Sequence, residues 1–395
     1  MKKRRIWPIL KKEINTDEII VITGSRQVGK TTTLKWLLKQ IPSNNKHYFD
    51  LENLRDKELF EVKDYNSLIN EFQNIGLKLD QKLYLTLDEI QALSNLPSVV
   101  KYLYDHYQIK FFLTGSSSYY IKNKFNESMA GRKINYEMLP LSFQEFLDFQ
   151  GVDYSLYEDP WVIKFLDPTF QKLNTYYREY IEYGGLPKVV LTSSVDRKKK
   201  LLEEIFSSYI RLDVKNLADF KSISDLRRVI NLLAARIGNK LNVTEIANIT
   251  GLNRITIANY IEFLEQTYLI RTIPAYSKSI DIKSRLQKKV YFVDTGIANV
   301  NADLSSGSKF ENTVCHQLFF WDGNLSYFSN RDGEIDFILE NEKEKGAFEV
   351  KETPTQRNFT ALKRRAERLG IQNYRIIGKE RSANFSDFLW GGQIK

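Results

Sequence analysis

The chain has 395 residues, a hydrophobic fraction of 42%, a charged fraction of 27% and a formal net charge of +9. This length exceeds what a single hydrophobic core usually supports, so we expect roughly two to three domains. No run of about 18 apolar residues occurs, and the basic start Met1–Arg5 leads into only a short apolar stretch, which argues against a membrane span and against a signal peptide.

The cysteine and histidine content limits the chemistry further. The one cysteine, Cys315, excludes an intrachain disulfide, and the three histidines are scattered without the spacing of zinc ligands. We therefore expect a reducing, cytoplasmic location and no membrane partner. The positive net charge favours an anionic partner such as nucleic acid.

The first strong pattern begins with the apolar run Ile19–Ile22, which predicts a buried parallel strand. Residues 24–31 then fit the pattern G-x-x-x-x-G-K-[ST], and Leu34, Leu37 and Leu38 recur at helical spacing after it. The order strand, glycine-rich loop and helix is the context in which this pattern binds nucleotide phosphates.

Each position of the loop has a physical role in binding ATP. Gly24 and Gly29 allow backbone angles that turn N–H groups toward phosphate oxygens. Lys30 can reach the β- and γ-phosphates, and the Thr31 hydroxyl is suited to bind Mg²⁺. The predicted nucleotide-binding residues are Gly24, Ser25, Arg26, Gln27, Val28, Gly29, Lys30, Thr31 and Thr32.

After a second expected strand at His47–Leu51, a further apolar strand, Leu83–Leu87, ends in the two acids Asp88 and Glu89. This is the Walker B pattern, and its place 58 positions after Lys30 is typical of a P-loop ATPase. Asp88 would then hold the Mg²⁺ shell, and Glu89 would polarise the attacking water. The alternative is a pair of solvated acids at the end of a strand.

Three further segments carry a resemblance to a known family: FFLTGSSS at 111–118, AGRKINYEMLPLSFQEF at 130–146 and YGGLPKVV at 183–190. With the loop and LYLTLDEIQ, they resemble a family of archaeal and bacterial AAA+-type ATPases with a C-terminal winged-helix and restriction-endonuclease-like region. The resemblance covers most of the chain. It implies an α/β fold with a parallel P-loop sheet and ATP hydrolysis. It also implies a homo-oligomer, for which a hexamer is one candidate.

The resemblance also implies two catalytic residues. Ser116 at the end of its strand, or Thr114 within it, would sense the γ-phosphate, although this segment is also an ordinary strand-ending turn. Arg132 precedes the expected fifth strand, where AAA+ proteins place an arginine finger that points at a neighbouring subunit's nucleotide. The alternative for Arg132 is a simple surface arginine.

A helix-turn-helix pattern follows in the middle of the chain. An amphipathic helix at 226–233, a capped helix at 242–250, a second helix at 253–264 and a strand at 268–273 predict a winged helix. The groups that could face a DNA groove are Arg254, Thr256, Asn259 and Tyr260. The alternative is a winged helix that packs against protein.

The last region combines Asp336 with Glu349-x-Lys351, which matches the D…(D/E)-x-K pattern of restriction-endonuclease-like nucleases. Two carboxylates from neighbouring strands can hold one Mg²⁺ or Mn²⁺, and Lys351 can orient the attacking water. Glu311 on the preceding helix resembles the family's additional acid. The alternative is a retained fold whose acids only pair with lysine and arginine.

These patterns divide the chain into four expected parts and one functional hypothesis. The parts are an ATPase core at 1–145, a helical lid at 146–215, a winged helix at 216–280 and a restriction-endonuclease-like α/β domain at 281–395. Residues 351–395 contain ten Lys or Arg against four Asp or Glu, which suits a DNA backbone.

We therefore expect an ATPase that acts on DNA and carries a metal-dependent nuclease-like domain. The alternatives are a DNA-remodelling motor with an inactive nuclease fold and a nucleotide-dependent switch that binds a protein partner.

Overall fold

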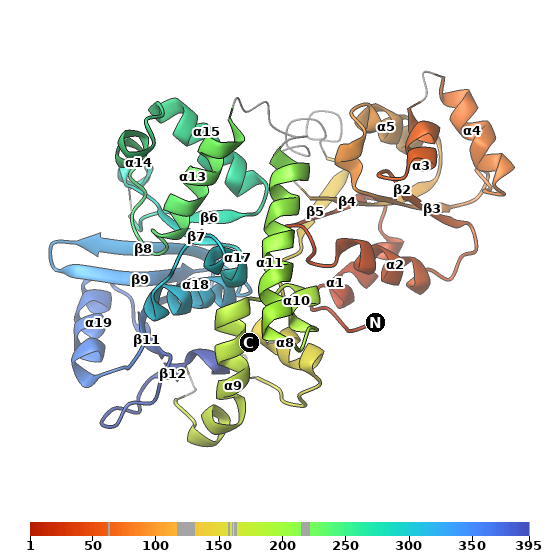
Figure 1. Ribbon diagram of the computed structural model, residues 1–395. Helices are drawn as coiled ribbons and strands as arrows, with labels where there is room; N and C mark the ends of the chain where they lie inside the picture. Colours follow the sequence, from red (N-terminus) through yellow and green to blue (C-terminus); the bar gives the residue numbers. More distant parts are fainter. Residues whose placement is uncertain are drawn as a thin grey trace. The chain divides into compact units, whose positions relative to one another are not determined.

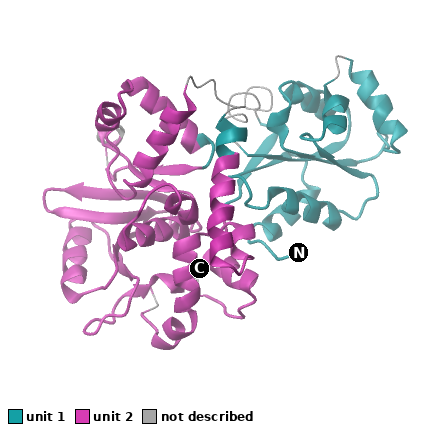
Figure 2. Ribbon diagram, in the orientation of Figure 1, with its two compact units in different colours: residues 1–139, 209–219, 266–268 teal, residues 140–208, 220–265, 269–395 magenta. Residues whose placement is uncertain are grey.

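The computed structural model describes residues 1–61, 64–116, 131–156, 159, 161, 164–214, 222–277 and 279–394. The chain forms two compact units (Figure 2). The first comprises Met1–Leu139, Tyr209–Asp219 and Gln266–Tyr268, and the second comprises Pro140–Ser208, Phe220–Glu265 and Leu269–Lys395. The first unit thus contains most of the expected ATPase core and adds two short segments from later in the chain.

The first unit is built on a five-stranded parallel sheet in the order β2-β3-β4-β1-β5 (Figure 1). The strands are β1 Ile19–Thr23, β2 Lys46–Asp50, β3 Leu83–Asp88, β4 Ile109–Gly115 and β5 Lys133–Glu137. Every residue of β1, β3 and β4 is buried, as expected for a parallel sheet covered on both faces. The predicted parallel P-loop sheet is therefore confirmed.

Helices cover both faces of this sheet (Figure 1). They are α1 Trp7–Lys12, η1 Glu13–Asn15, α2 Lys30–Gln40, α3 Leu54–Phe60, α4 Tyr65–Asn74, η2 Ile90–Ala92 and α5 Leu96–His106. Phe49 of β2 packs against Phe60 and Phe72, with ring centroids 5.1 and 5.8 Å away. This aromatic cluster fixes α3 and α4 against the edge of the sheet.

Two later segments complete the first unit. The helix α11 Val195–Tyr209 leads directly into a π-helical turn, η4 Ile210–Val214. The Tyr209 hydroxyl lies 2.7 Å from Thr267 Oγ1, and the Tyr268 hydroxyl donates to Thr23 Oγ1 at 2.7 Å. Tyr268 has φ of +59°, a strained value for a non-glycine residue, so its position next to the end of β1 is imposed by its surroundings.

The second unit begins with helices and ends in a mixed sheet. Its sheet has the order β12-β11-β10-β9-β8, in which β8, β9 and β10 are antiparallel neighbours and β10, β11 and β12 are parallel. The strands are β8 Asn324–Asn330, β9 Gly333–Glu340, β10 Lys345–Lys351, β11 Asn373–Gly378 and β12 Leu389–Trp390. The helices outside the helix-turn-helix region, apart from α11, are α8 Phe143–Gln150, α9 Asp167–Tyr183, α10 Pro187–Val190, α16 Ile280–Arg285, α17 Thr295–Asn299, α18 Ser306–Leu318, α19 Gln356–Arg368 and η5 Gly391–Gln393.

The helix-turn-helix region has helices where the sequence predicts them. They are α13 Ile223–Ala234, α14 Val243–Thr250 and α15 Arg254–Gln266, followed by the antiparallel pair β6 Ile270–Ile273 and β7 Lys289–Phe292. Two details differ from the prediction. The strand expected from Tyr268 begins at Ile270, because the positive φ of Tyr268 is incompatible with a strand. Tyr260 is buried, so it does not face outward with Arg254 and Asn259, which are exposed.

Across the residues that the structure describes, none of the helices combines the length and the apolar character needed to cross a membrane.

A buried carboxylate in the second unit gives a pH-dependent contribution to stability. Asp294 caps α17 and accepts hydrogen bonds from Gly185 N at 2.8 Å and Ile297 N at 3.1 Å. Burial raises the pKa of Asp294 to about 6 from 3.8, and the backbone hydrogen bonds limit this rise.

The folded protein should therefore bind a proton at Asp294 where the unfolded chain has already lost it. The contribution of this residue to the free energy of unfolding should fall by up to about 3 kcal/mol as the pH rises from 4 to 6. Urea unfolding of the protein and of Asp294→Asn across this range measures the effect. The stability of the parent relative to the variant should decline with pH, and a constant difference would contradict the prediction.

Candidate functional site

The phosphate-binding loop lies between the end of β1 and the start of α2, as predicted. Gly24 and Gly29 have φ of +148° and +101°, and Gln27 has φ of +61°. A Cβ atom built on Gly24 would lie 2.1 Å from the carbonyl oxygen of Met138, so only glycine fits there. The loop is thus a strained arch that follows a fully buried strand and ends at the N-terminus of an 11-residue helix.

The groups inside this arch fit the phosphates of a nucleotide. Lys30 is buried, and its Nζ donates to the carbonyl oxygens of Gly24 at 2.9 Å and Ser25 at 2.8 Å. Burial lowers the pKa of Lys30, and the nearby acids oppose this effect. The Ser25 hydroxyl is buried without a hydrogen-bond partner among the described residues. A buried cation and an unpaired hydroxyl next to a helix N-terminus are what a polyphosphate requires.

The remaining loop residues occupy the expected places. Arg26 and Val28 belong to the arch, and Thr31 and Thr32 begin the first turn of α2. Thr31 is half-buried, as suits a hydroxyl ligand of Mg²⁺, whereas Thr32 is exposed.

The predicted Walker B acid is held at the neighbouring strand end. Asp88, the last residue of β3, is 2% exposed and accepts a hydrogen bond from the Tyr48 hydroxyl at 2.8 Å. Its second oxygen accepts one from Thr114 Oγ1. Burial, and then the contact with Asp88, raise the pKa of Tyr48, so this hydroxyl stays a donor. Thr114 therefore orients Asp88, which the sequence did not indicate.

Glu89, the predicted polariser of water, has φ of +54°, a backbone conformation that residues in general avoid. Gln91 Nε2 donates to the Glu89 carboxylate and to Ser116 Oγ, the latter at 3.1 Å. Gln91 thereby connects the predicted acid to the predicted γ-phosphate sensor. In the sequence, the only indication of this role for Gln91 is its position two residues after Glu89 in the DEIQ stretch.

One acid near the loop was not predicted at all. Asp213 in η4 pairs with Arg26 Nε, and its other oxygen accepts a hydrogen bond from Ser116 Oγ at 2.8 Å. Ser116 and Asp213 are 97 positions apart, so no local pattern relates them. The predicted sensor therefore contacts a carboxylate that only the tertiary structure brings to the loop.

Arg132 lies at the N-terminal ends of the strands of the same sheet, whereas the phosphate loop lies at their C-terminal ends. It precedes β5, its carbonyl oxygen accepts from Ile19 N at 2.8 Å, and its Nε pairs with Asp105 at 3.1 Å. Because β1 runs for five residues from there to the loop, roughly 16 Å separate Arg132 from its own phosphate site. Arg132 thus cannot contact nucleotide bound to its own loop without a large movement.

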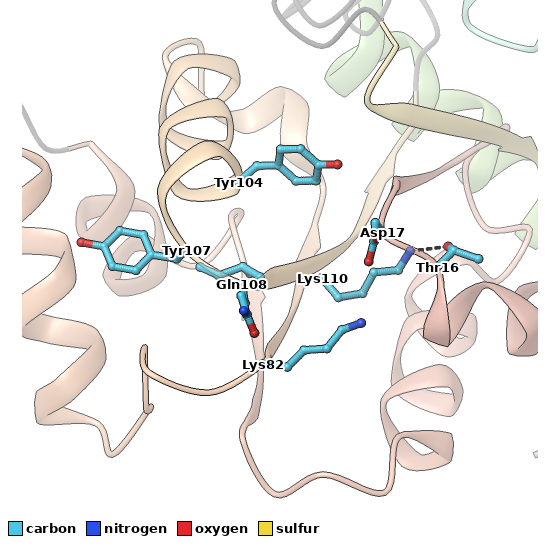
Figure 3. Close-up of a pocket in the computed structure, with 8 residues that line it drawn as sticks. Thr16, Asp17, Lys82, Tyr104, Tyr107, Gln108 and Lys110 are labelled. Atoms are coloured by element: carbon cyan, nitrogen blue, oxygen red, sulfur yellow. Dashed lines mark hydrogen bonds between the residues drawn. The ribbon is translucent and has the colours of Figure 1, made fainter.

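A pocket of about 330 Å³ also lies at the N-terminal ends of these strands (Figure 3). It is lined by Thr16, Asp17, Lys82, Tyr104, Tyr107, Gln108, Ile109 and Lys110. Lys110 Nζ donates to Thr16 Oγ1 at 2.8 Å, and burial lowers the pKa of Lys110 to about 8. Tyr104 and Tyr107 lie at the C-terminal end of α5, and the other lining residues precede or begin β1, β3 and β4, so the pocket is separate from the phosphate-binding loop.

The C-terminal acids converge as the sequence predicts. β9 and β10 are antiparallel with Phe337 opposite Phe348, which brings Asp336 next to Glu349. Asp336 Oδ2 accepts a hydrogen bond from Val350 N at 2.8 Å, and Lys351 Nζ lies 3.0 Å from Glu349 Oε1. The D…E-x-K residues therefore form one cluster.

A lysine that the sequence did not single out also belongs to this cluster. Lys289 of β7 has a buried side chain whose Nζ lies 3.8 Å from Glu311, 3.9 Å from Asp336 and against Glu334. The Tyr291 hydroxyl also donates to Glu311 at 2.7 Å. Burial, and secondly the Asp336 charge, raise the pKa of Glu311 to about 7. The carboxylate of Glu311 thus already contacts Lys289 and the Tyr291 hydroxyl.

The donor set limits which metal site this cluster can form. Among the residues that the structure describes, no three His, Cys, Asp or Glu side chains are gathered as ligands of a metal ion. Arg365 adds a further cation, with Nη1 3.4 Å from Glu349 Oε2 and 2.8 Å from the Glu334 carbonyl oxygen. The carboxylates of Asp336 and Glu349 are hard oxygen donors, the ligand type that Mg²⁺ and Mn²⁺ prefer.

These features define the class of the first unit: a P-loop nucleotide-binding domain with a parallel sheet. Residues 16–147 match a family described as an AAA domain. Residues 174–308 and 306–390 match two families described as domains of unknown function, DUF8612 and DUF4143.

The chain is also similar to whole proteins. It is 28% identical over 381 residues to the uncharacterized protein MJ1544 of Methanocaldococcus jannaschii, covering 91% of this chain and 81% of that protein. It is 27% identical to an uncharacterized protein of Haemophilus influenzae, covering 86% of this chain and 84% of that protein.

Solved structures show a more distant similarity. The Aeropyrum pernix ORC1 protein in complex with DNA has 11% identity and a TM-score of 0.32, over 75% of this chain and 90% of that chain. The Thermotoga maritima RuvB Holliday junction branch migration motor has 15% identity and a TM-score of 0.31, over 67% and 85%.

Proposed function

We propose that this protein is an ATP-hydrolysing AAA-type ATPase that acts on DNA. The observation that carries the proposal is the meeting of three predicted residues at one edge of the first unit's sheet. Lys30 is buried in the phosphate loop, Asp88 is held in place by two hydroxyl donors, and Glu89 follows Asp88 in a strained conformation. ATP would be bound by the loop residues, with Mg²⁺ at Thr31 and Asp88.

The roles of the chain's own residues follow from their chemistry. Lys30 would leave its loop carbonyls for the β- and γ-phosphates, which are stronger acceptors. Glu89 would accept a proton from the attacking water, and Gln91 would hold its carboxylate in place. When bound, Mg²⁺ would neutralise part of the negative charge of the phosphates.

We further propose that the protein works as a homo-oligomer in which Arg132 contacts a neighbouring subunit's nucleotide. This rests on the position of Arg132 at the far edge of the sheet from its own loop. The arginine is held by Asp105 in a partly exposed position, from which another subunit could take it up. A hexamer is one candidate for this assembly.

The proposed DNA contact rests on charge and exposure. On α19, the exposed residues include Arg357, Lys363, Arg364 and Arg368, next to the C-terminal acidic cluster. On α15, Arg254 and Asn259 are exposed. Cations on such surfaces suit the phosphates of a DNA backbone.

For the C-terminal cluster, we propose a nuclease-like site in which Asp336 and Glu349 hold one divalent cation and Lys351 orients the attacking water. The convergence of these residues on β9 and β10 supports it. A specific observation favours the alternative of an inactive nuclease fold acting within a DNA-remodelling motor. Lys289 already contacts Glu311, Glu334 and Asp336, and its positive charge lowers the attraction of this cluster for a metal ion.

The ATPase proposal is tested by Glu89→Gln. The variant should bind ATP with unchanged affinity, because Lys30 and Asp88 remain, and should hydrolyse it roughly 10²- to 10⁴-fold more slowly, because the water loses its base. Binding and phosphate release are both measured. Glu71→Gln, an exposed glutamate on α4, is the matched control and should behave like the parent. Hydrolysis at the parent rate by Glu89→Gln would disprove the role of Glu89.

The role of Arg132 is tested by mixing two inactive proteins. Arg132→Ala supplies an intact loop, and Lys30→Ala supplies an intact arginine, so mixed interfaces should recover ATP turnover that neither protein has alone. Asp105→Asn, which removes only the partner of Arg132, should remain active. The proposal fails if the protein sediments as a monomer with ATP and still hydrolyses it.

The C-terminal site is tested by DNA cleavage with Mn²⁺ on linear, branched and single-stranded substrates. Asp336→Ala should abolish cleavage because it removes a metal ligand, while ATP turnover stays at the parent rate because the loop lies in the other unit. Asp332→Ala, an exposed acid on the same hairpin, is the matched control and should still cut. If the parent cuts none of the substrates, the inactive-nuclease alternative replaces this proposal.

A further inference from the structure

Asp213 places a carboxylate among the groups that would receive the nucleotide's phosphates. The residue is 1% exposed, and both of its oxygens are engaged in the first unit. One oxygen pairs with Nε of Arg26 in the phosphate loop, and the other accepts the Ser116 hydroxyl at 2.8 Å. A buried carboxylate is costly unless it is paired, so this contact holds η4 against the loop.

The charges around Asp213 place it against the two cations of the phosphate loop, Lys30 and Arg26. Burial lowers the pKa of Lys30, and the charges of Glu89 and then Asp213 counteract this lowering. Burial raises the pKa of Asp213, whereas Arg26, through its charge and its hydrogen bond, lowers it. Asp213 therefore interacts electrostatically with both cations of the loop.

The other residues of the site do not compete in this way. Asp88 is held by the neutral hydroxyls of Tyr48 and Thr114 and remains available to a Mg²⁺ shell. Glu89 is held by the neutral amide of Gln91. Of these three acids, only Asp213 is paired directly with a cation of the loop. The same carboxylate also accepts a hydrogen bond from Ser116, the predicted γ-phosphate sensor.

We propose that Asp213 distinguishes ATP from ADP by competing with the terminal phosphate for Arg26 and Ser116. This inference rests on the proposed nucleotide site. ATP carries the additional phosphate that can take over both donors, and its negative charge repels the Asp213 carboxylate. ADP lacks that phosphate, so the contact of Asp213 with the loop persists when ADP is bound.

The proposal gives the chain a direct response to the nucleotide. Asp213 lies in η4, which continues from α11 without a break in the chain. Release of Asp213 would free η4 from the loop only in the ATP state. A π-helical turn is an uncommon element that often marks functional positions, and here it carries the residue that would move.

The test compares the affinities of ATP and ADP for Asp213→Asn and for the parent, each with Mg²⁺ and with Glu89→Gln added so that ATP is not consumed. Asparagine keeps the shape of Asp213 and loses its charge. The ratio of ATP affinity to ADP affinity should rise on the order of tenfold, because a like charge near the terminal phosphate is removed. Asp17→Asn, an exposed aspartate at the other edge of the sheet, should leave the ratio unchanged.

A second measurement needs no change at Asp213, which could disturb folding. In the Glu89→Gln protein, backbone amides of residues 210–214 should exchange hydrogen faster with ATP bound than with ADP bound. Equal exchange in the two states, or an affinity ratio that Asp213→Asn does not raise, would overturn the inference while leaving the nucleotide site intact. Failure of the parent to bind either nucleotide would instead overturn the proposed function and this inference with it.

Discussion

The parallel pairing of β1, β3 and β4 is the constraint on which the candidate nucleotide site depends. Parallel strands end at the same edge of a sheet, so the phosphate loop after Thr23, the acids that end β3 and the polar end of β4 meet there. The burial of all three strands leaves little freedom to shift them. Positions far apart in the chain are thus held within hydrogen-bonding distance of one another.

Electrostatic balance is the second feature of this edge. The loop places Lys30 and Arg26 among Asp88, Glu89 and Asp213, and each acid has its own kind of partner. Neutral donors hold the two Walker B acids, while a cation of the loop holds Asp213. Charges in such a buried place interact strongly, so a polyphosphate bound as proposed would reorganise these partners.

The C-terminal cluster follows a different principle. Its acids on β9, β10 and α18 are accompanied by three cations: Lys289 of β7, Lys351 of β10 and Arg365 of α19. The cluster is therefore close to neutral without a metal ion. Through its contacts with Glu311, Glu334 and Asp336, Lys289 reduces the negative potential that would attract a divalent cation to this cluster.

The sequence by itself determined the elements of both sites. A buried apolar strand, a glycine-rich loop and a helix can be recognised within about 20 residues, because the loop pattern and the hydrophobic periodicity are local. The position of Asp88 and Glu89 at the end of β3 and the pairing that brings Asp336 next to Glu349 were likewise predictable from the strands. The bounds of the strand at Ile270 were missed, because the positive φ of Tyr268 is imposed by the fold.

Only the tertiary structure decided which partners these residues have. Asp213, Lys289 and Arg365 carry no motif, and their charges read as ordinary surface charges in the sequence. They become site residues because η4, β7 and α19 pack where a buried charge requires a partner. The physical reason is that ion pairs between distant segments depend on three-dimensional proximity, whereas loops and strands depend on neighbouring residues in the chain.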